Sequence, residues 1–303
     1  MLAFTFPGQG SQRPGMGRPW LDHESWELVG EASEVADRDV ARLLLDADAN
    51  ELKDTRNAQL TTFVLSLVVL DAVERLGLEP THCAGHSLGE YTALIATGAL
   101  GFTDGVRLVS ERAEAMHDAG LENPGTMAAV LGLDDEQVEV ACRLADSDVW
   151  VANFNAPGQI VIAGTKAGIE RAIEVAKKRG VRRALPLPVS APFHCELMKP
   201  AEEKLQPILD AANFKDLWVS LVSNVDASPI GTAHAVRNAL LRQVVSSVRW
   251  VESVQKMVSM GVKRFVEIGP GTVLTGLIKR IDANAELINI SDAASLENFL
   301  NAH

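Results

Sequence analysis

A serine flanked by glycines is the feature of this sequence best suited to chemistry. Ser87 lies in Gly85-His86-Ser87-Leu88-Gly89, between a strand-like segment at 81–84 and a helix expected at about 88–97. Glycines allow a turn too tight for a Cβ, and such a strand–turn–helix pushes the serine hydroxyl out of the fold. Free N–H groups at the start of the helix face any anion that forms there. The pattern predicts acyl transfer through an acyl-serine rather than an incidental glycine-rich turn.

Such a serine needs a base, and His194 is the best placed of the seven histidines. It ends Ser190-Ala191-Pro192-Phe193-His194, a loop between a predicted strand and a predicted helix. Loops of this kind commonly carry catalytic groups, and a histidine there can take the serine proton. No acidic residue stands out as a third member, since Glu196 is only two residues further along. We therefore expect a Ser–His dyad, with a backbone carbonyl orienting the imidazole.

Arg112 is the second residue whose setting is unusual. It shares one face of a helix predicted over 104–119 with Leu108, Val109 and Met116. An arginine in an apolar stripe must snorkel, pair internally or meet a ligand. Its planar fork suits a carboxylate. The pattern alone leaves the ligand site and the internal ion pair equally open.

Two glycine-rich loops accompany these residues. Gly8-Gln9-Gly10-Ser11-Gln12 follows the first predicted strand but lacks the endings of phosphate-binding and dinucleotide-binding loops. Its position favours a backbone N–H donor for an oxyanion. Gly269-Pro270-Gly271 is expected to be a structural turn.

The elements that must position these residues alternate along the chain. Strands are expected at 2–6, 81–84, 218–222, 263–268 and 285–290, and helices at 19–36, 39–45, 57–76, 88–97, 103–119, from 196, 233–245, 251–260 and 273–280. This alternation predicts a parallel sheet covered on both faces. Residues 125–189 instead follow the order βαββαβ, a ferredoxin-like unit. We expect a large α/β domain from 1–123 and 191–303, and a small inserted domain at 124–190.

Charge and composition argue against several classes of protein. Lys and Arg number 28 against 40 Asp and Glu, a net charge of −12, so non-specific binding to nucleic acid or an anionic membrane is not expected. The longest apolar segment, 63–73, has the length of a core helix rather than of a membrane span. Cys83, Cys142 and Cys195 are scattered, which predicts neither a disulfide framework nor a metal site and fits a reducing cytoplasm.

Six motifs, in order, resemble the malonyl-CoA:acyl carrier protein transacylase family over nearly the whole chain. They are Phe6-Pro7-Gly8-Gln9-Gly10-Ser11-Gln12, Gly85 to Tyr91, Arg112 with Met116, Asn153 to Gln159, Phe193-His194 and Glu267 to Gly271. The resemblance implies an α/β-hydrolase-like large domain with a ferredoxin-like insert. It also implies ping-pong transfer of malonyl from malonyl-CoA to the phosphopantetheine thiol of acyl carrier protein, without metal or redox cofactor.

The resemblance further implies a role for each matching residue. Ser87 is the nucleophile, His194 the base and Arg112 the carboxylate-binding residue, while Gln243 holds the histidine through its backbone carbonyl. Gln9 and Leu88 are the oxyanion N–H donors, and Met116, Phe193 and Asn155 form the acyl pocket, with Phe193 associated with preference for unbranched malonyl. Leu60 and His117 depart from the family pattern, and His117 leaves details of the acyl pocket open.

Several alternatives stay open at this point. A serine thioesterase or hydrolase on a related fold would share the dyad but has no need for Arg112, and a relative could serve another acyl group, in fatty acid or polyketide synthesis. A non-catalytic carrier-binding subunit is disfavoured by the intact set of residues. Two basic runs, 177–183 and Lys279-Arg280, are candidates for docking an acidic carrier, or are merely solvated helix ends.

Overall fold

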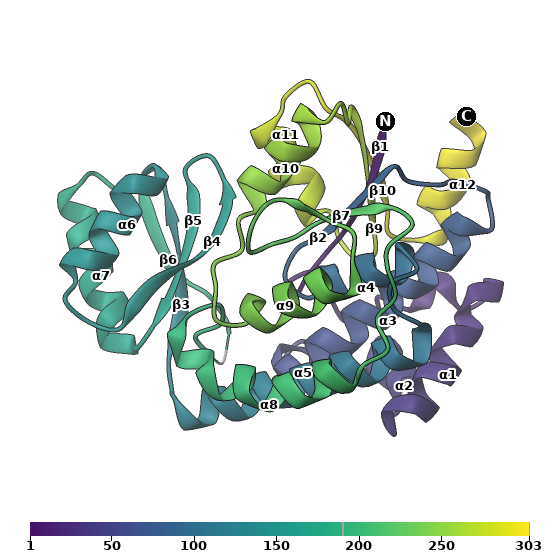
Figure 1. Ribbon diagram of the computed structural model, residues 1–303, viewed down its shortest axis with the longest axis horizontal. Coiled ribbons are helices and arrows are strands. Elements are labelled where there is room, and N and C mark those ends of the chain that lie inside the picture. Colours follow the sequence, from purple (N-terminus) through teal and green to yellow (C-terminus); the bar gives the residue numbers. More distant parts are fainter. Residues whose placement is uncertain (190, 303) are drawn as a thin grey trace.

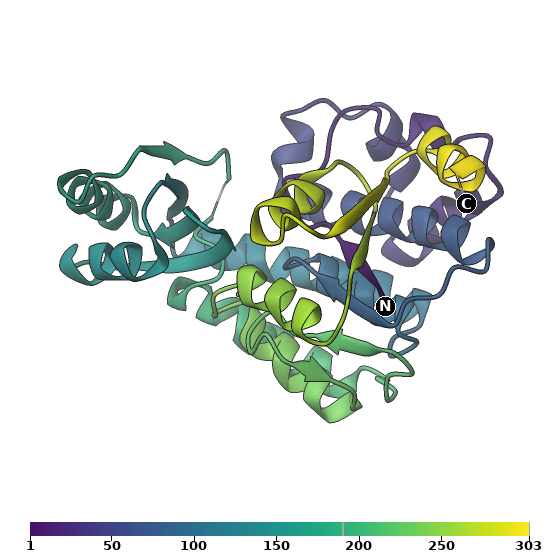
Figure 2. The same cartoon turned by 90° about the horizontal axis from the view of Figure 1, so that it is seen from above.

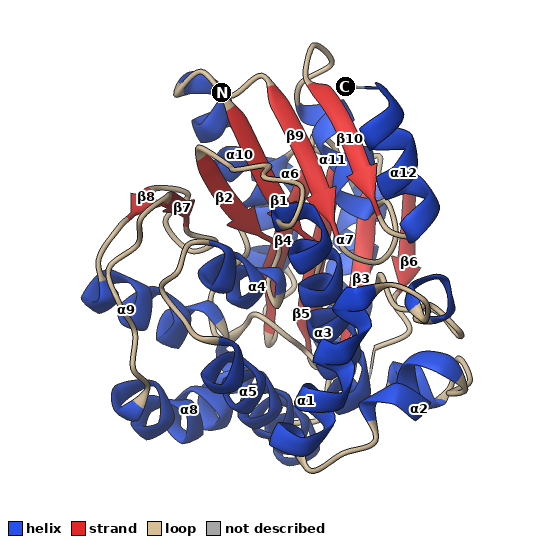
Figure 3. Cartoon of the chain, turned by 90° about the vertical axis from the view of Figure 1, so that its right-hand side faces the viewer, coloured by secondary structure: helices blue, strands red, loops and turns tan. Residues whose placement is uncertain are grey.

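The computed structural model describes residues 1–189 and 191–302 and has two lobes, each built on its own sheet (Figure 1). Ser190 and the last residue of the chain, which end the expected insert and the expected large domain, lie outside the described residues. The larger sheet runs in the order β10-β9-β1-β2-β7-β8, parallel except for β8 (Figure 3). Its strands are β1 (Leu2–Phe6), β2 (His82–Gly85), β7 (Ser220–Val222), β8 (Pro229–Ile230), β9 (Arg264–Ile268) and β10 (Glu286–Ile290). The predicted parallel sheet is confirmed, with β8 as an added edge strand.

Helices cover both faces of this sheet, because alternate residues of each strand point to opposite sides. Ala3 and Phe265 share a core with α10 (Trp250–Ser259) and α11 (Val273–Ile281). Phe4 and Val266 belong to the larger core on the other face. The remaining helices of this lobe are α1 (Glu27–Ala36), α2 (Val40–Leu45), α3 (Thr55–Glu74), α4 (Gly89–Ala96), α5 (Phe102–Glu122), α8 (Lys199–Ala211), α9 (Ala233–Gln243) and α12 (Ala293–Ala302), with short 3-10 turns η3 (Glu51–Lys53) and η4 (Glu196–Met198).

Helix α3 contains the most apolar segment of the chain. By length and composition it could cross a membrane, but 89% of its most apolar window is buried inside the protein. It is the central helix of the large core, which confirms the prediction of a core helix there.

The continuous helix expected over 19–36 is wrong. The chain forms two 3-10 turns, η1 (Arg18–Trp20) and η2 (Glu24–Trp26), before α1 begins. His23 is extended, and its Nδ1 accepts from the Ser25 N–H at 3.2 Å, so it caps a new turn. Local side-chain capping therefore interrupts a segment whose apolar spacing is helical throughout.

The smaller sheet forms the lobe that projects from the body of the molecule (Figure 2). Its strands pair in the antiparallel order β4-β5-β3-β6, as in a ferredoxin-like unit, with two helices packed on them. They are β3 (Thr126–Leu131), α6 (Asp135–Leu144), β4 (Val149–Ala156), β5 (Gln159–Gly164), α7 (Lys166–Lys178) and β6 (Arg183–Pro186). Strand β6 is shorter than the 181–189 expected and ends at a proline, which has no N–H to donate.

The two lobes are joined along β4. Phe154 N–H donates to Val248 O, and Val248 N–H to Ala152 O, each at 2.9 Å. These bonds place the segment before α10 beside β4, so the small sheet borders the carboxyl ends of the parallel strands.

Candidate active site

Ser87 lies at a sharp turn between β2 and α4. Its φ is +51°, a left-handed conformation that side chains rarely adopt. A Cβ on Gly85 would lie 1.9 Å from the Gly89 carbonyl carbon, and one on Gly89 would lie 2.0 Å from Phe6 O. The two glycines are therefore required by close packing of the turn, while the strained dihedral angle falls on the serine itself.

Asn224, which sequence reasoning missed, clamps this turn from the loop that follows β7. Its Oδ1 accepts from the Ser87 N–H at 2.7 Å, and its Nδ2 donates to Gly85 O at 2.6 Å. The side chain is buried. The asparagine amide carries both an acceptor and donors, so one side chain satisfies the Ser87 N–H and the Gly85 carbonyl oxygen.

His194 lies opposite Ser87 and is buried. Its Nε2 is 2.7 Å from Ser87 Oγ, and its Nδ1 is 2.9 Å from Gln243 O. A carbonyl only accepts, so Nδ1 carries the proton and Nε2 is free to accept from the serine. Burial and then the charge of Arg112 lower the pKa of His194 to about 3. The imidazole is therefore neutral at neutral pH.

Arg112 reaches the same serine from α5 and is 1% exposed. Its Nη2 donates to Ser87 Oγ at 3.1 Å and to Gln243 Oε1 at 2.9 Å, and its Nη1 donates to Gln59 Oε1. Its Nε is buried without a partner among the described residues. No carboxylate is hydrogen-bonded to this guanidinium in the described part of the chain. A direct internal ion pair, one of the two readings left open by the sequence, does not occur there.

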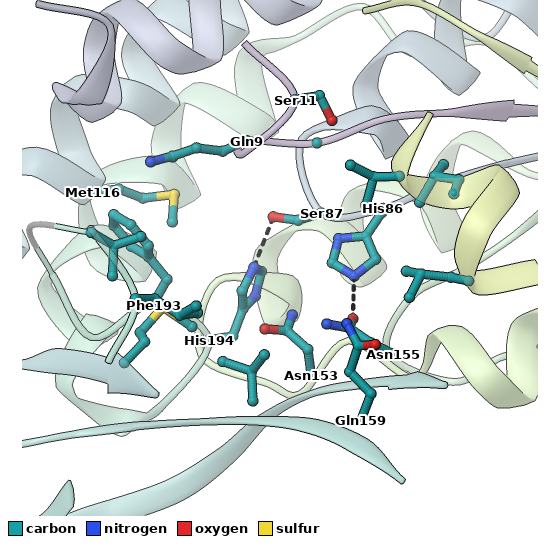
Figure 4. Close-up of a pocket in the computed structure, with 18 of the residues that line it drawn as sticks. Gln9, Ser11, His86, Ser87, Met116, Asn153, Asn155, Gln159, Phe193 and His194 are labelled. Carbon is teal, nitrogen blue, oxygen red and sulfur yellow. Dashed lines mark hydrogen bonds between the residues drawn. The ribbon is translucent and has the colours of Figure 1, made fainter. Parts of the chain in front are cut away.

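These side chains line one cavity of about 180 Å³ (Figure 4). Gln9, Met116, Asn155 and Phe193, all singled out from the sequence, line it together with Ser87, His194 and Arg112. Leu88 does not line it; this buried residue occupies the N-cap position of α4, so its N–H lies outside the helical ladder. His117 is absent from the described lining.

Three polar residues of the site carried no signal in the sequence analysis. His86 lines the cavity, and its Nε2 is 2.8 Å from Asn155 Oδ1 (Figure 4). Gln59 contacts Arg112 as well as Met116 Sδ. Glu90 is buried and bonded to the Gln243 side chain. Each was hidden because its partner is distant in the sequence.

A groove lined by three exposed arginines adjoins this cavity. Arg182, Arg183 and Arg280 line it, with no Asp or Glu among its described lining residues. Arg280 donates to Gln159 Oε1, and Gln159 lines both the groove and the cavity. The two basic runs of the sequence therefore meet at one place.

The turn at 269–271 supports α11, which contributes to both walls. Glu267 accepts from Leu274 N–H at 2.9 Å and from Thr275 N–H at 2.8 Å, so its carboxylate caps the helix. Leu277 of α11 lines the cavity and Arg280, one turn further, lines the groove.

The sequence matches the acyl transferase domain family over residues 3–296. It is 44% identical to the malonyl CoA-acyl carrier protein transacylase of Bacillus subtilis over 301 residues, which cover 98% of this chain and 95% of the relative. It is 43% identical to the malonyl CoA-acyl carrier protein transacylase of Escherichia coli K12, over 92% of both chains.

Solved structures give the same picture. The acyl-carrier-protein S-malonyltransferase of Burkholderia pseudomallei superposes with a TM-score of 0.95, at 46% identity and 99% coverage of both chains. The malonyl-transacylase PlMCAT, solved in complex with the type II polyketide acyl-carrier protein AntF, superposes with a TM-score of 0.96, at 40% identity, covering 100% of this chain and 99% of that one. The α/β fold with its second, antiparallel sheet is thus shared.

Proposed function

This chain belongs to the malonyl-CoA:acyl carrier protein transacylase family, and we propose that it carries the malonyl group on Ser87 between malonyl-CoA and the carrier. The enzyme is an acyltransferase whose partners are malonyl-CoA and acyl carrier protein. The observation that carries the role of Ser87 is that its Oγ lies 2.7 Å from His194 Nε2 and 3.1 Å from Arg112 Nη2. One hydroxyl is thus in reach of a base and of a carboxylate-binding cation.

In the first half-reaction, Ser87 Oγ attacks the thioester carbonyl while His194 Nε2 takes its proton. The N–H groups of Gln9 and Leu88 stabilise the oxyanion, and each such donor contributes about 3 kcal/mol. The C–S bond then breaks, and the imidazolium returns its proton to the CoA sulfur. Malonyl-Ser87 remains, His194 is neutral again, and the proton of the Ser87 hydroxyl leaves on the CoA thiol.

Arg112 holds the free carboxylate of the malonyl group. Its fork suits a carboxylate, and its unpartnered Nε provides one donor without breaking an existing bond. A bound carboxylate also offsets the positive charge that lowers the pKa of His194. The base is therefore stronger when the correct cargo is present, which separates malonyl from neutral acyl groups.

In the second half-reaction, the phosphopantetheine thiol of the carrier attacks malonyl-Ser87 in the reverse sense. We propose that the carrier docks at the groove of Arg182, Arg183 and Arg280. These exposed charges have no carboxylate in the groove lining and border the mouth of the cavity through Gln159. An acidic carrier would supply the missing negative charge.

The test is intact-protein mass spectrometry after mixing with malonyl-CoA. We expect one malonyl increment on the native chain and none on Ser87→Ala. Adding holo carrier should remove the increment and transfer it to the carrier thiol. Rapid loss of the increment without carrier would instead identify a thioesterase, and an increment that survives in Ser87→Ala would exclude Ser87 as the nucleophile.

Two further assignments belong to this proposal. We propose domain limits of 1–123 with 191–303 and 124–190, supported by the separate core of the smaller sheet. We propose a cytoplasmic location, supported by Cys83, Cys142 and Cys195, which are buried free thiols.

A further inference from the structure

Glu90 is a buried carboxylate that the mechanism above does not use. It lies in the first turn of α4, three residues after Ser87, and its relative exposure is 0%. No Lys, Arg or His forms an ion pair with it among the described residues. Burying a carboxylate without a partner charge is costly, so its hydrogen bonds must offset a large penalty.

Glu90 accepts hydrogen bonds from Asn224 N–H, at 3.3 Å, and from the Gln243 side chain, and the second bond leads on to Arg112. Gln243 Nε2 donates to Glu90 Oε2 at 2.5 Å and to Ser87 O at 3.0 Å. Gln243 Oε1 accepts from Arg112 Nη2 at 2.9 Å. The amide of Gln243 therefore lies between a carboxyl group and a guanidinium that are not bonded to each other.

The chemistry of the two neighbours decides which way this amide points. A guanidinium only donates hydrogen bonds, and an ionised carboxylate only accepts them. The NH₂ of Gln243 must face Glu90 and its oxygen must face Arg112. In the reverse orientation the NH₂ would face the N–H of Arg112, and the amide oxygen would face the carboxylate oxygen of Glu90. The main-chain oxygen of Ser87, which accepts from the same NH₂ at 3.0 Å, favours the same orientation.

We propose that Glu90 is a positioning residue for malonyl recognition: it locks the Gln243 amide with its oxygen toward Arg112, and so aims Arg112 at the carboxylate of the acyl group. This inference rests on the proposed role of Arg112. The lock acts through the side chain of Gln243, whereas His194 is held by the main-chain carbonyl at the end of α9. Its effect therefore falls on cargo binding rather than on the base.

A double-mutant cycle between Glu90→Gln and Arg112→Ala tests the proposal, with the rate of malonyl loading on Ser87 as the readout. Glu90→Gln keeps the volume but presents a group that also donates. We expect it to slow loading about tenfold to hundredfold in the native background, the size of a hydrogen bond to a charged group. In the Arg112→Ala background we expect a further change within about twofold. Equal losses in both backgrounds, or no loss in the native one, would overturn the proposal.

Two companion variants separate positioning from folding. Gln243→Met removes the side-chain amide but keeps the main-chain carbonyl that holds His194. We expect it to slow malonyl loading as much as Glu90→Gln does, and the double variant to be no slower than either single one. Glu267→Gln alters another buried carboxylate, which caps α11, and its effect should be the same in both backgrounds. Thermal unfolding checks that each variant is folded. If Arg112→Ala itself leaves malonyl loading unchanged, the proposed role of Arg112 fails. If Arg112→Ala slows loading but its effect and that of Glu90→Gln are additive, only the present inference fails.

Discussion

In two neighbouring regions, one buried and one exposed, arginines have no carboxylate partner among the residues that the structure describes. Arg112, in the cavity, is 1% exposed and bonded to two neutral amides and a hydroxyl. Arg182, Arg183 and Arg280, in the adjoining groove, are exposed to solvent. Both regions therefore have positive charge to offer an anion, but in different dielectric surroundings.

The difference determines what each region can discriminate. A buried charge interacts strongly and at fixed geometry, so Arg112 can tell a malonyl group from an acetyl group. Charges at a wet surface are screened by salt and contribute little each, so the groove can guide a large acidic partner but not select an acyl group. Substitutions in the two regions should consequently differ in size and in salt dependence.

The largest effect is expected for Arg112→Ala. Loss of a bidentate bond to the malonyl carboxylate should slow malonyl loading on Ser87 about 100-fold to 1,000-fold, since each charged hydrogen bond contributes about 1.5 to 3 kcal/mol. Acetyl loading should be spared or improved. Competition between the two acyl-CoAs, followed by intact mass, measures the ratio. Arg107→Ala, on the exposed face of the same helix, is the matched control. Equal loss of malonyl and acetyl loading would make Arg112 a structural residue.

The buried titratable groups around the cavity should also make the free energy of unfolding depend on pH. The pKa of His194 falls from 6.5 to about 3 on folding, because of burial and then Arg112. The unfolded chain binds more protons between these values, so the free energy of unfolding rises with pH there, by up to about 1.4 kcal/mol per unit. Burial raises the pKa of Glu90 from 4.5 to about 7, so its contribution falls with rising pH across that window.

These two contributions oppose each other between pH 4.5 and 6.5, and variants separate them. We expect the difference in unfolding free energy between the native chain and His194→Gln to increase with pH from about 3 to 6.5. For Glu90→Gln the same difference in unfolding free energy should decrease as the pH rises from 4.5 to about 7. Urea unfolding at a series of pH values measures both. A flat difference for either variant would contradict the burial argument.

Sequence reasoning reached the parallel sheet, the small sheet and the residues around Ser87 because these depend on local patterns. Ser87 and His194 follow from a turn and a loop, and the order βαββαβ follows from apolar spacing. It missed Asn224, Gln59 and Glu90, since their partners are respectively 137, 53 and 153 positions away. It also joined η1, η2 and α1 into one helix, because apolar spacing does not register a side-chain cap such as that of His23.

The two basic runs show the same limit at the surface. Lys178 and Arg182 belong to one run in the sequence, but only Arg182 lines the groove, while Arg280 arrives from the second run. Charge density along the chain therefore does not say which charges act together. Reversing the charge of one residue at a time shows whether the groove or the whole basic run of the sequence binds the carrier.

The smallest effect is expected for these reversals. Arg182→Glu should raise the Michaelis constant for the carrier about threefold to tenfold at low salt, the size of one or two rim charge contacts, and much less at high salt. Lys178→Glu changes the net charge equally but lies outside the groove, so it should stay within about twofold. Malonyl loading from CoA should change less than carrier transfer in either variant. If Lys178→Glu matches Arg182→Glu, total charge rather than the groove attracts the carrier; if neither changes the constant, the carrier docks elsewhere and the contrast between the two arginine regions applies to the cavity alone.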